Sequence, residues 1–251
     1  MNSLTNNTQR LTEHFQNDRK IIGAYPEDLK VALSSLDTQE ALNEIKSWKG
    51  YKSTQLHSLQ GFAKEIGVQD ILYKDESTRF GLGSFKALGG AYGVLKFIQN
   101  QLTEDLNKNI SIRDIRDGQY LDLTKNYTVV TATDGNHGRS VAYGAKLSGC
   151  KCQIYIHAEV SVGRQHAMEE FGATVIRIKG NYDESLRICI EEATKNNWQI
   201  ISDTSYEGYT RYPRYIMAGY TVLAHEIAEQ LDYKNMPSHI FLQAGVGGFA
   251  A

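Results

Sequence analysis

Lys86 is the residue whose surroundings in this chain most favour covalent chemistry. It lies in the run GLGSFKALGG, residues 81–90, with Phe85 before it and apolar residues after it at helical spacing. Ser84 has a side chain suited to an N-cap, so we expect Lys86 in the first turn of a helix. There the helix dipole and partial burial both disfavour the ammonium form. A lysine that works uncharged can hold an aldehyde as a Schiff base, and the flanking glycines favour this role over that of a solvated surface lysine.

Two aspartates follow predicted strands, at positions where side chains of an α/β protein meet a ligand. Asp134 lies in TDGNHG, residues 133–138, and Asp203 lies in SDTSY, residues 202–206. Both carboxylates are candidates for general acid or base catalysis. From the residues alone, helix capping is favoured over catalysis for Asp134, and turn formation stays open for Asp203.

Two glycine-rich segments could face a cofactor. Residues 133–138 follow a strand and open a helix, so their backbone amides and short side chains can face a bound ring. Residues 245–248 follow the apolar run 240–242 and are expected to open a helix whose amides and dipole hold a phosphate. The cluster at 245–248 is neither a P-loop nor a dinucleotide fingerprint, and residues 81–83 lack the third glycine of the latter.

Three patterns resemble parts of metal sites, but we interpret each of them as having another role. The sequence HEIAE at 225–229 has glutamate where a metalloprotease helix has its second histidine, so we interpret it as a solvated helix face. Cys150, Cys152 and Cys189 are an odd number without a zinc ligand set, which predicts reduced structural thiols. His137 has no partner at metal-ligand spacing and is interpreted as a loop or stacking residue.

Short apolar or β-branched runs alternate with helical patterns from residue 71 onward, which predicts a parallel α/β architecture. The strands are expected at 71–74, 127–131, 153–157, 174–178, 199–202 and 239–243. A surface helix is expected before them, with Leu42, Ile45 and Trp48 on one face and Asp37 and Glu40 as a capping pair. The polar segment 100–126, with an Asp-Gly turn at 117–118, is interpreted as an insertion or surface excursion.

The composition places the chain in the ordinary globular range, with 251 residues, 41% hydrophobic and 22% charged. The net charge of −2 is spread without a long block of either sign, so we expect a small-molecule partner and neither a nucleic-acid nor a membrane surface. The first fifteen residues have no apolar core of signal-peptide length, and no later segment is apolar for the length of a membrane span. With the reduced thiols, these features predict a cytoplasmic protein.

Five ordered segments resemble those of the fold-type-II pyridoxal phosphate enzymes, and they look most like the diaminopropionate ammonia-lyases. They are YKSTQLHSL, KDESTRFGLGSFKALGGAYG, TATDGNHGRSVAYGAKLSG, SDTSYEGY and QAGVGG, from about residue 51 to the last residue. The resemblance implies a three-layer α/β fold in which a small domain, 90–209, is inserted into a large domain formed by 1–89 and 210–251. It also implies that the chain is truncated at its C-terminus, that the large domain is incomplete, and that the full-length protein is a homodimer.

The same resemblance implies roles for the candidate residues. Lys86 would bind pyridoxal 5′-phosphate, and Asn136 would contact the 3′-oxygen of the cofactor. Asp134 and Asp203 would flank the Cα atom of the substrate on opposite faces. The phosphate would bind at Gly245, Val246, Gly247 and Gly248, and the substrate at Thr133, Asp134, Gly135 and His137.

Together these roles imply β-elimination of ammonia from D- or L-2,3-diaminopropionate, giving pyruvate and ammonia. A serine or threonine dehydratase is the alternative of the same class. It is disfavoured because many such enzymes have serine where this chain has Asp134. A catalytically silent, truncated binding module is the alternative from a different class.

Overall fold

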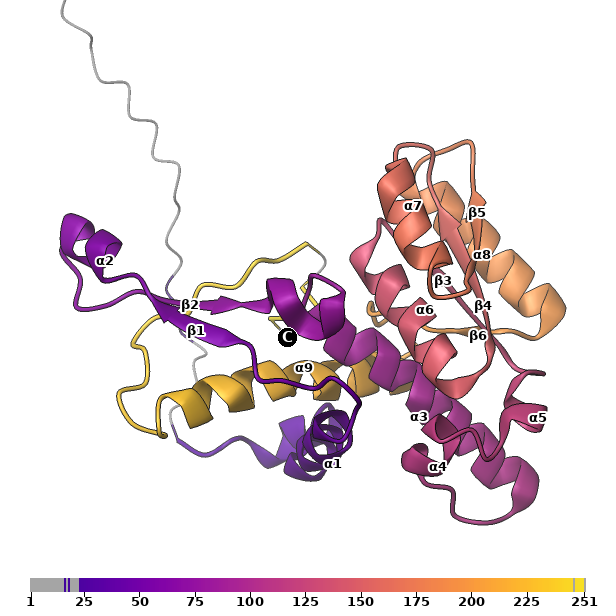
Figure 1. Ribbon diagram of the computed structural model, residues 1–251, viewed down its shortest axis with the longest axis horizontal. Helices are drawn as coiled ribbons and strands as arrows, with labels where there is room; N and C mark the ends of the chain where they lie inside the picture. Colours follow the sequence, from indigo (N-terminus) through magenta and orange to yellow (C-terminus); the bar gives the residue numbers. More distant parts are fainter. Residues whose placement is uncertain (1–15, 17, 19–22, 246, 251) are drawn as a thin grey trace, which may run out of the picture.

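A computed structural model describes residues 16, 18, 23–245 and 247–250 (Figure 1). The expectation about a signal peptide in residues 1–15 lies outside this range. The strands are β1 (Gln55–Ser58), β2 (Leu72–Asp75), β3 (Thr128–Ala132), β4 (Lys151–Ile156), β5 (Thr174–Arg177) and β6 (Gln199–Ile200). The α-helices are α1 (Ser35–Lys46), α2 (Gln60–Ile66), α3 (Lys86–Leu106), α4 (Ile112–Arg116), α5 (Leu121–Thr124), α6 (Asn136–Ser148), α7 (Val162–Glu169), α8 (Tyr182–Asn196) and α9 (Arg211–Gln230). Two 3-10 helices, η1 (Glu27–Val31) and η2 (Glu76–Gly81), precede α1 and α3.

A four-stranded parallel sheet in the order β5-β4-β3-β6 forms the centre of one half of the molecule (Figure 1). Side chains along a strand alternate between its two faces. Val129 and Ile154 point into the apolar cluster on the α6 side, whereas Val130 and Tyr155 pack with Cys189 of α8. The sheet is therefore covered by α6 on one face and α8 on the other, which confirms the predicted three-layer α/β class.

Two of the six expected strands, at 71–74 and 239–243, differ from the prediction. Residues 71–74 do not join the parallel sheet, because β2 pairs antiparallel with β1 in a separate two-stranded hairpin. The short connection between them, which contains α2, returns the chain in the opposite direction. Residues 239–243 form no strand, and Ile240 and Phe241 are 70% and 93% exposed. An extended segment becomes a strand only when a neighbouring segment forms hydrogen bonds with its backbone. None of the described residues forms such a ladder with 239–243.

The surface helix before the sheet exists, but its predicted cap is only half right. Ser34 is the N-cap of α1, and it exchanges hydrogen bonds with Asp37 in a capping box. Glu40 takes no part in the cap and instead accepts a hydrogen bond from Lys96 Nζ at 2.7 Å. The apolar face of α1 is buried as expected, with Leu42 and Ile45 in the core.

The segment 100–126 is not the surface excursion that its polarity suggests. It contains the last turns of α3 and the short helices α4 and α5. Ile110, Ile112 and Ile115 are at most 4% exposed, because they form an apolar face that packs into the main core. The expected turn is present, with Gly118 at a φ of 81°.

Helix α3 joins the two halves of the molecule, because it packs against both α6 and α9 (Figure 1). Its crossing with α9 is a backbone contact. A Cβ atom on Gly219 would lie 2.6 Å from the Leu88 carbonyl oxygen and 2.9 Å from Gly89 Cα. The expected boundary between the two domains, at residues 89 and 90, falls inside this helix, and the division into domains stays a prediction.

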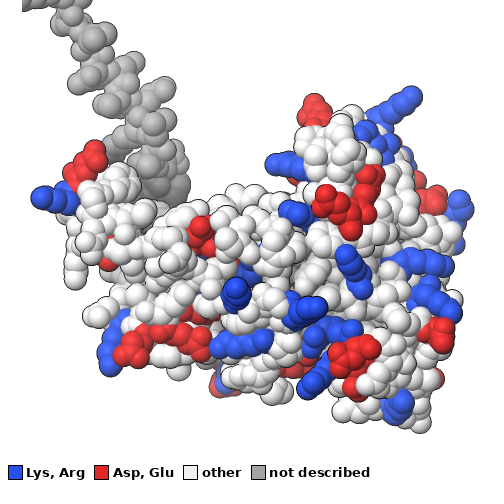
Figure 2. Space-filling model, viewed as in Figure 1, with Lys and Arg blue, Asp and Glu red and all other residues white. Residues whose placement is uncertain are grey.

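Lysine, arginine, aspartate and glutamate side chains are interspersed on the face shown in Figure 2, without a large area of one sign. In the described part of the chain, no helix combines the length and the apolar composition needed to cross a membrane.

Candidate active site

Lys86 is the first residue of α3, as expected. The chain reaches it through η2 and a turn in which Phe80 has a φ of 50° and Gly81 and Gly83 have φ values of 72° and 73°. The Lys86 amide donates a hydrogen bond to Ser84 Oγ at 3.2 Å, although the N-cap position itself is held by Phe85. The tight turn therefore fixes where the lysine side chain leaves the backbone.

The Lys86 ammonium forms an ion pair with the carboxylate of Asp203, and both side chains are largely buried. Asp203 follows β6, so the end of a strand meets the beginning of α3. Burial raises the pKa of Asp203, but the nearby His137 and Lys86 outweigh burial and hold this pKa below its usual value. Asp203 is consequently a carboxylate at neutral pH, in direct contact with the candidate cofactor lysine.

His137 lies in the first turn of α6 and is 7% exposed, so its interpretation as a loop or stacking residue is wrong. Its Nε2 atom is 2.8 Å from the Ile201 carbonyl oxygen, and its Nδ1 atom is 3.8 Å from Asp203 Oδ2. The ring therefore bridges α6 and the segment that carries Asp203.

An aromatic wall made of Phe85, Tyr220 and Phe249 encloses the lysine. The Lys86 Nζ atom lies 5.5 Å from the ring centre of Phe85 and 5.4 Å from that of Tyr220. Phe85 and Phe249 stack with their ring centres 4.2 Å apart. Burial and the charge of Asp203 raise the pKa of Tyr220 well above its usual value. Sequence reasoning missed Tyr220, because its helical spacing from Ile216 and Leu223 is typical of an ordinary core residue.

The glycine segment near residue 247 lies against Asp203. A Cβ atom on Gly248 would be 2.9 Å from the Asp203 carbonyl oxygen, so this contact requires glycine. The expected helix is not found: residues 247–250 form one turn, closed by the Ala250 amide bonding to the Gly247 carbonyl at 2.8 Å. A helix needs consecutive bonds of this kind, and one turn supplies a single bond. Val246 lies outside the described residues, and the phosphate-binding role of this segment stays a prediction.

The loop between β3 and α6 is organised by Thr133. Its Oγ1 atom accepts hydrogen bonds from the amides of Gly135 and Gly138, both at 3.1 Å. Asp134 has a 65% exposed side chain, and its Oδ1 atom is 3.1 Å from His157 Nε2. Asn136 is the exposed first residue of α6. The Thr133 hydroxyl therefore fixes the backbone of this loop at the amino end of α6.

The structure does not bring all of the predicted site residues into contact. Lys86, His137, Asp203 and Gly248 lie together, whereas the Asp134 carboxylate pairs with His157 instead of this group. Tyr182 was missed by sequence reasoning. Its pKa is raised by burial and then by the charges of Asp203 and Asp134, so it lies within electrostatic reach of both. Opposite placement of the two aspartates around a substrate stays a prediction.

Glu226 overturns the interpretation of residues 225–229 as a solvated face. Its side chain is 0% exposed and accepts hydrogen bonds from Arg79 Nη1 at 2.7 Å, Arg79 Nη2 at 2.8 Å and Lys74 Nζ at 2.8 Å. Tyr51 and Thr54 donate to the same carboxylate. We call these five residues the Glu226 network. It fastens α9 to β2 and η2, the segment that leads directly to Lys86.

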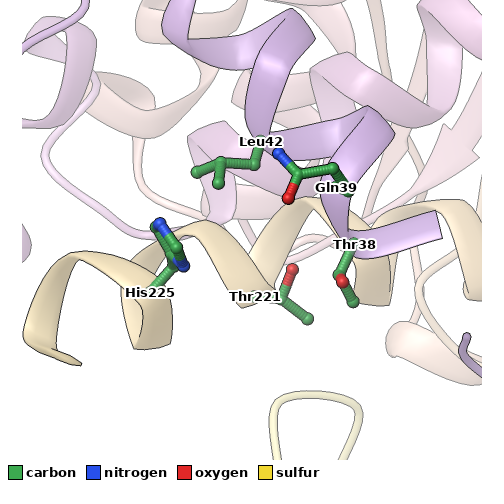
Figure 3. Close-up of a pocket in the computed structure, with 5 residues that line it drawn as sticks. All are labelled: Thr38, Gln39, Leu42, Thr221 and His225. Atoms are coloured by element: carbon green, nitrogen blue, oxygen red, sulfur yellow. The ribbon is translucent and has the colours of Figure 1, made fainter. Parts of the chain in front are cut away.

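A cavity of about 210 Å³ between α1 and α9 is separate from this site (Figure 3). It is lined by Thr38, Gln39, Leu42, Thr221 and His225, none of which belongs to the lysine site. The two threonine hydroxyls donate to carbonyls of their own helices, and the Gln39 amide donates to Asn43. These polar groups of the cavity already form hydrogen bonds within their own helices, so they do not indicate a ligand. Among the residues that the structure describes, no three His, Cys, Asp or Glu side chains gather to hold a metal ion.

Comparisons with known proteins show which family the chain resembles. The family described as "Pyridoxal-phosphate dependent enzyme" matches residues 48–251. Diaminopropionate ammonia-lyase of Salmonella typhimurium is 39% identical over 213 residues, covering 84% of this chain and 52% of that protein. A probable D-serine dehydratase of Rhizobium leguminosarum is 25% identical over 225 residues, covering 83% of this chain and 49% of that protein.

Among solved structures, Escherichia coli diaminopropionate ammonia-lyase in complex with D-serine superimposes with a TM-score of 0.78 at 36% identity. The match covers 86% of this chain and 54% of that one. The chain spans about half the length of the curated relatives it matches. Since the family match covers residues 48–251, most of the sequence, the chain belongs to the pyridoxal-phosphate dependent enzymes.

Proposed function

We propose that this chain binds pyridoxal phosphate at Lys86 and supports β-elimination of ammonia from D- or L-2,3-diaminopropionate, giving pyruvate and ammonia. The observation that carries the proposal is the contact between Lys86 and the buried Asp203 carboxylate at the start of α3. The 39% identity to a diaminopropionate ammonia-lyase supports the choice of substrate. Asp134, where many dehydratases of this fold have serine, favours elimination of an amine over elimination of water.

The residues around Lys86 fit the cofactor. The Lys86 side chain is 20% exposed, and the close contact of Gly248 with the Asp203 backbone brings the glycine segment beside the lysine site. The Tyr220 hydroxyl is buried and has no hydrogen-bond partner among the described residues, as expected for a polar group beside a ligand site. When bound, pyridoxal phosphate supplies a conjugated ring that spreads the negative charge formed at the substrate Cα.

The side chains of this chain would handle the protons. Asp203, a carboxylate in contact with Lys86, would accept the Cα proton at Oδ2 from one face of the substrate. Its contact with Lys86 Nζ provides a route for that proton to the lysine amine. Asp134 would act from the other face and keep the leaving amine protonated, since a neutral amine leaves poorly. The aromatic rings of Phe85 and Tyr220 lie beside the Lys86 amine, and Phe249 packs against both rings.

Borohydride reduction tests the central claim. Pyridoxal phosphate added to the chain is expected to give a visible absorption band, and reduction is expected to fix the cofactor on Lys86, mapped by mass spectrometry. Lys86→Ala should abolish both signals, because the only amine in contact with Asp203 among the described residues is then gone. Lys151→Ala, which removes an exposed lysine of β4, is the matched control and should change neither signal. An adduct on another lysine would refute the proposal.

We further propose a cytoplasmic homodimer for the complete protein. The three cysteines are free, and burial raises the pKa of each thiol, which suits a reducing compartment. Light scattering on the purified holoenzyme measures its mass, which we expect to be twice that of the polypeptide. A mass equal to one polypeptide would contradict the dimer.

A further inference from the structure

A second cavity, of about 340 Å³, lies between the amino ends of α6 and α7. It is lined by Gly135, Asn136 and Arg139 on one side and by Ser161, Gly163 and Arg164 on the other. Asn136, Ser161, Gly163 and Arg164 are exposed, so the cavity opens to solvent. Gly135 precedes α6 and Asn136 begins it, so the cavity adjoins the residues of the proposed substrate site.

Arg164 lies across that loop. Its Nη1 atom donates a hydrogen bond to the Asp134 carbonyl oxygen at 3.2 Å. A Cβ atom on Gly135, whose φ is 151°, would lie 3.1 Å from Arg164 Cδ, so the absence of a side chain at this position lets the arginine approach. The guanidinium is thereby held beside the backbone of residues 134 and 135.

Arg139 supplies a second cation from α6. Its Nη1 atom donates to the Leu82 carbonyl oxygen at 2.9 Å, and its guanidinium lies 5.9 Å from the Phe171 ring centre. The Nε atom is buried and has no hydrogen-bond partner in the described part of the chain. Within those same residues, neither Arg139 nor Arg164 forms an ion pair with a carboxylate, although most other arginines do.

Charges of both signs lie near the cavity. Arg139 and Arg164 line it, and the exposed Asp134 carboxylate, 3.1 Å from His157 Nε2, belongs to the adjoining loop. Ser161 Oγ already caps the Arg164 amide, so the two guanidinium groups, more than the α7 amino end, make this surface attractive to an anion. Arginine guanidinium groups bind carboxylates in a bidentate geometry, and Arg139 and Arg164 both line this cavity.

We propose that this cavity is an outer carboxylate subsite, which captures the carboxylate of an incoming amino acid before the molecule reaches Lys86. The inference rests on the proposed function, because the amino acid is the substrate of the site at Lys86. Carboxylates are recognised by arginine in a planar, bidentate geometry, and two arginines line this cavity. The loop at Gly135 and Asn136 would then be shared between the outer subsite and the inner site.

Acetate binding tests the subsite without using catalysis. Amide NMR spectra of the chain, titrated with sodium acetate at constant ionic strength balanced with chloride, are expected to show saturable shifts at Gly135, Asn136 and Gly163. Arg164→Gln should raise the Kd for acetate roughly threefold to tenfold, since it removes one charge-assisted contact at an exposed position. Arg164→Lys should retain part of the affinity. Arg113→Gln, which removes another exposed arginine, on α4, should leave the Kd unchanged.

Several outcomes would overturn the subsite. Shifts that chloride reproduces, or an acetate Kd that is the same in Arg164→Gln and the unsubstituted chain, would show that no carboxylate site exists here. The titration is repeated without cofactor in Lys86→Ala, where we expect the same acetate Kd. A failure of acetate binding therefore leaves the cofactor proposal intact, and a failure of borohydride trapping leaves the carboxylate subsite intact.

Discussion

Replacing Glu226 with glutamine is expected to lower the free energy of unfolding by about 3–5 kcal/mol. The change keeps the shape of the side chain but leaves Arg79 and Lys74 buried without their shared carboxylate. Urea unfolding followed by circular dichroism measures the effect. Glu229→Gln is the matched control: Glu229 lies one helical turn away, pairs with Lys46, and is 42% exposed. Glu229→Gln should lower the free energy of unfolding by less than about 1 kcal/mol. Equal losses in the two variants would contradict the structural role assigned to the Glu226 network.

The same carboxylate predicts sensitivity to acid. Burial raises the pKa of Glu226, but hydrogen bonds from Arg79 and Lys74 outweigh burial and lower the pKa from 4.5 to about 2. A lowered pKa in the folded state gives stability that is complete above pH 4.5 and is lost as the pH falls from 4.5 toward 2. We expect a loss of about 3 kcal/mol across this window, absent in Glu226→Gln. A stability difference between the two proteins that does not change with pH in this window would contradict the assignment.

Replacing Asp203 or Asp134 with asparagine in the holoenzyme is expected to reduce turnover of one diaminopropionate enantiomer by roughly 10²- to 10⁴-fold. The reason is that each acid is proposed to serve a different face of the substrate Cα. Asp203→Asn should affect one enantiomer more strongly, and Asp134→Asn the other. Pyruvate release with each pure enantiomer measures the effect, and the cofactor absorption band reports whether the cofactor is still bound.

Asp122→Asn provides the control for this pair. Asp122 pairs with Lys125 on α5 and is 96% exposed, so its replacement should leave both rates unchanged. Equal losses with both enantiomers in Asp203→Asn and in Asp134→Asn would contradict the two-faced assignment. A preference of the unsubstituted enzyme for serine over diaminopropionate would instead favour the dehydratase alternative.

The sequence predicted those parts of the fold whose signals are local. The strands β3, β4 and β5 were expected within a few residues of their bounds, because each is a short apolar run between turns. Lys86 at the start of a helix was confirmed for a similar reason, since glycine and serine mark the turn before it. The hairpin was missed because β1 has the sequence QLHS, which contains only one aliphatic residue.

The rest of the site depends on contacts between distant segments, which no local pattern contains. Glu226 looks solvated on its own helix, and only Arg79, 147 positions earlier in the chain, makes it a buried acid. Tyr220 has the helical spacing of a core residue, and its place beside Lys86 follows from the crossing of α3 and α9. The strand expected at 239–243 had the right composition but found no partner among the described residues.

The crossing at Gly219 has a mechanical consequence for α3. The helix touches α9 backbone to backbone at Leu88 and Gly89, one turn from Lys86, while its other end at Leu106 is about 26 Å away. The contact therefore divides α3 into a short segment that carries Lys86 and a long segment that ends at Leu106. A tilt of about 5° would carry the far end roughly 2 Å but move the Lys86 Cα by only about 0.4 Å. The backbone contact at Gly219 therefore holds the Lys86 end of α3 in place more firmly than its far end.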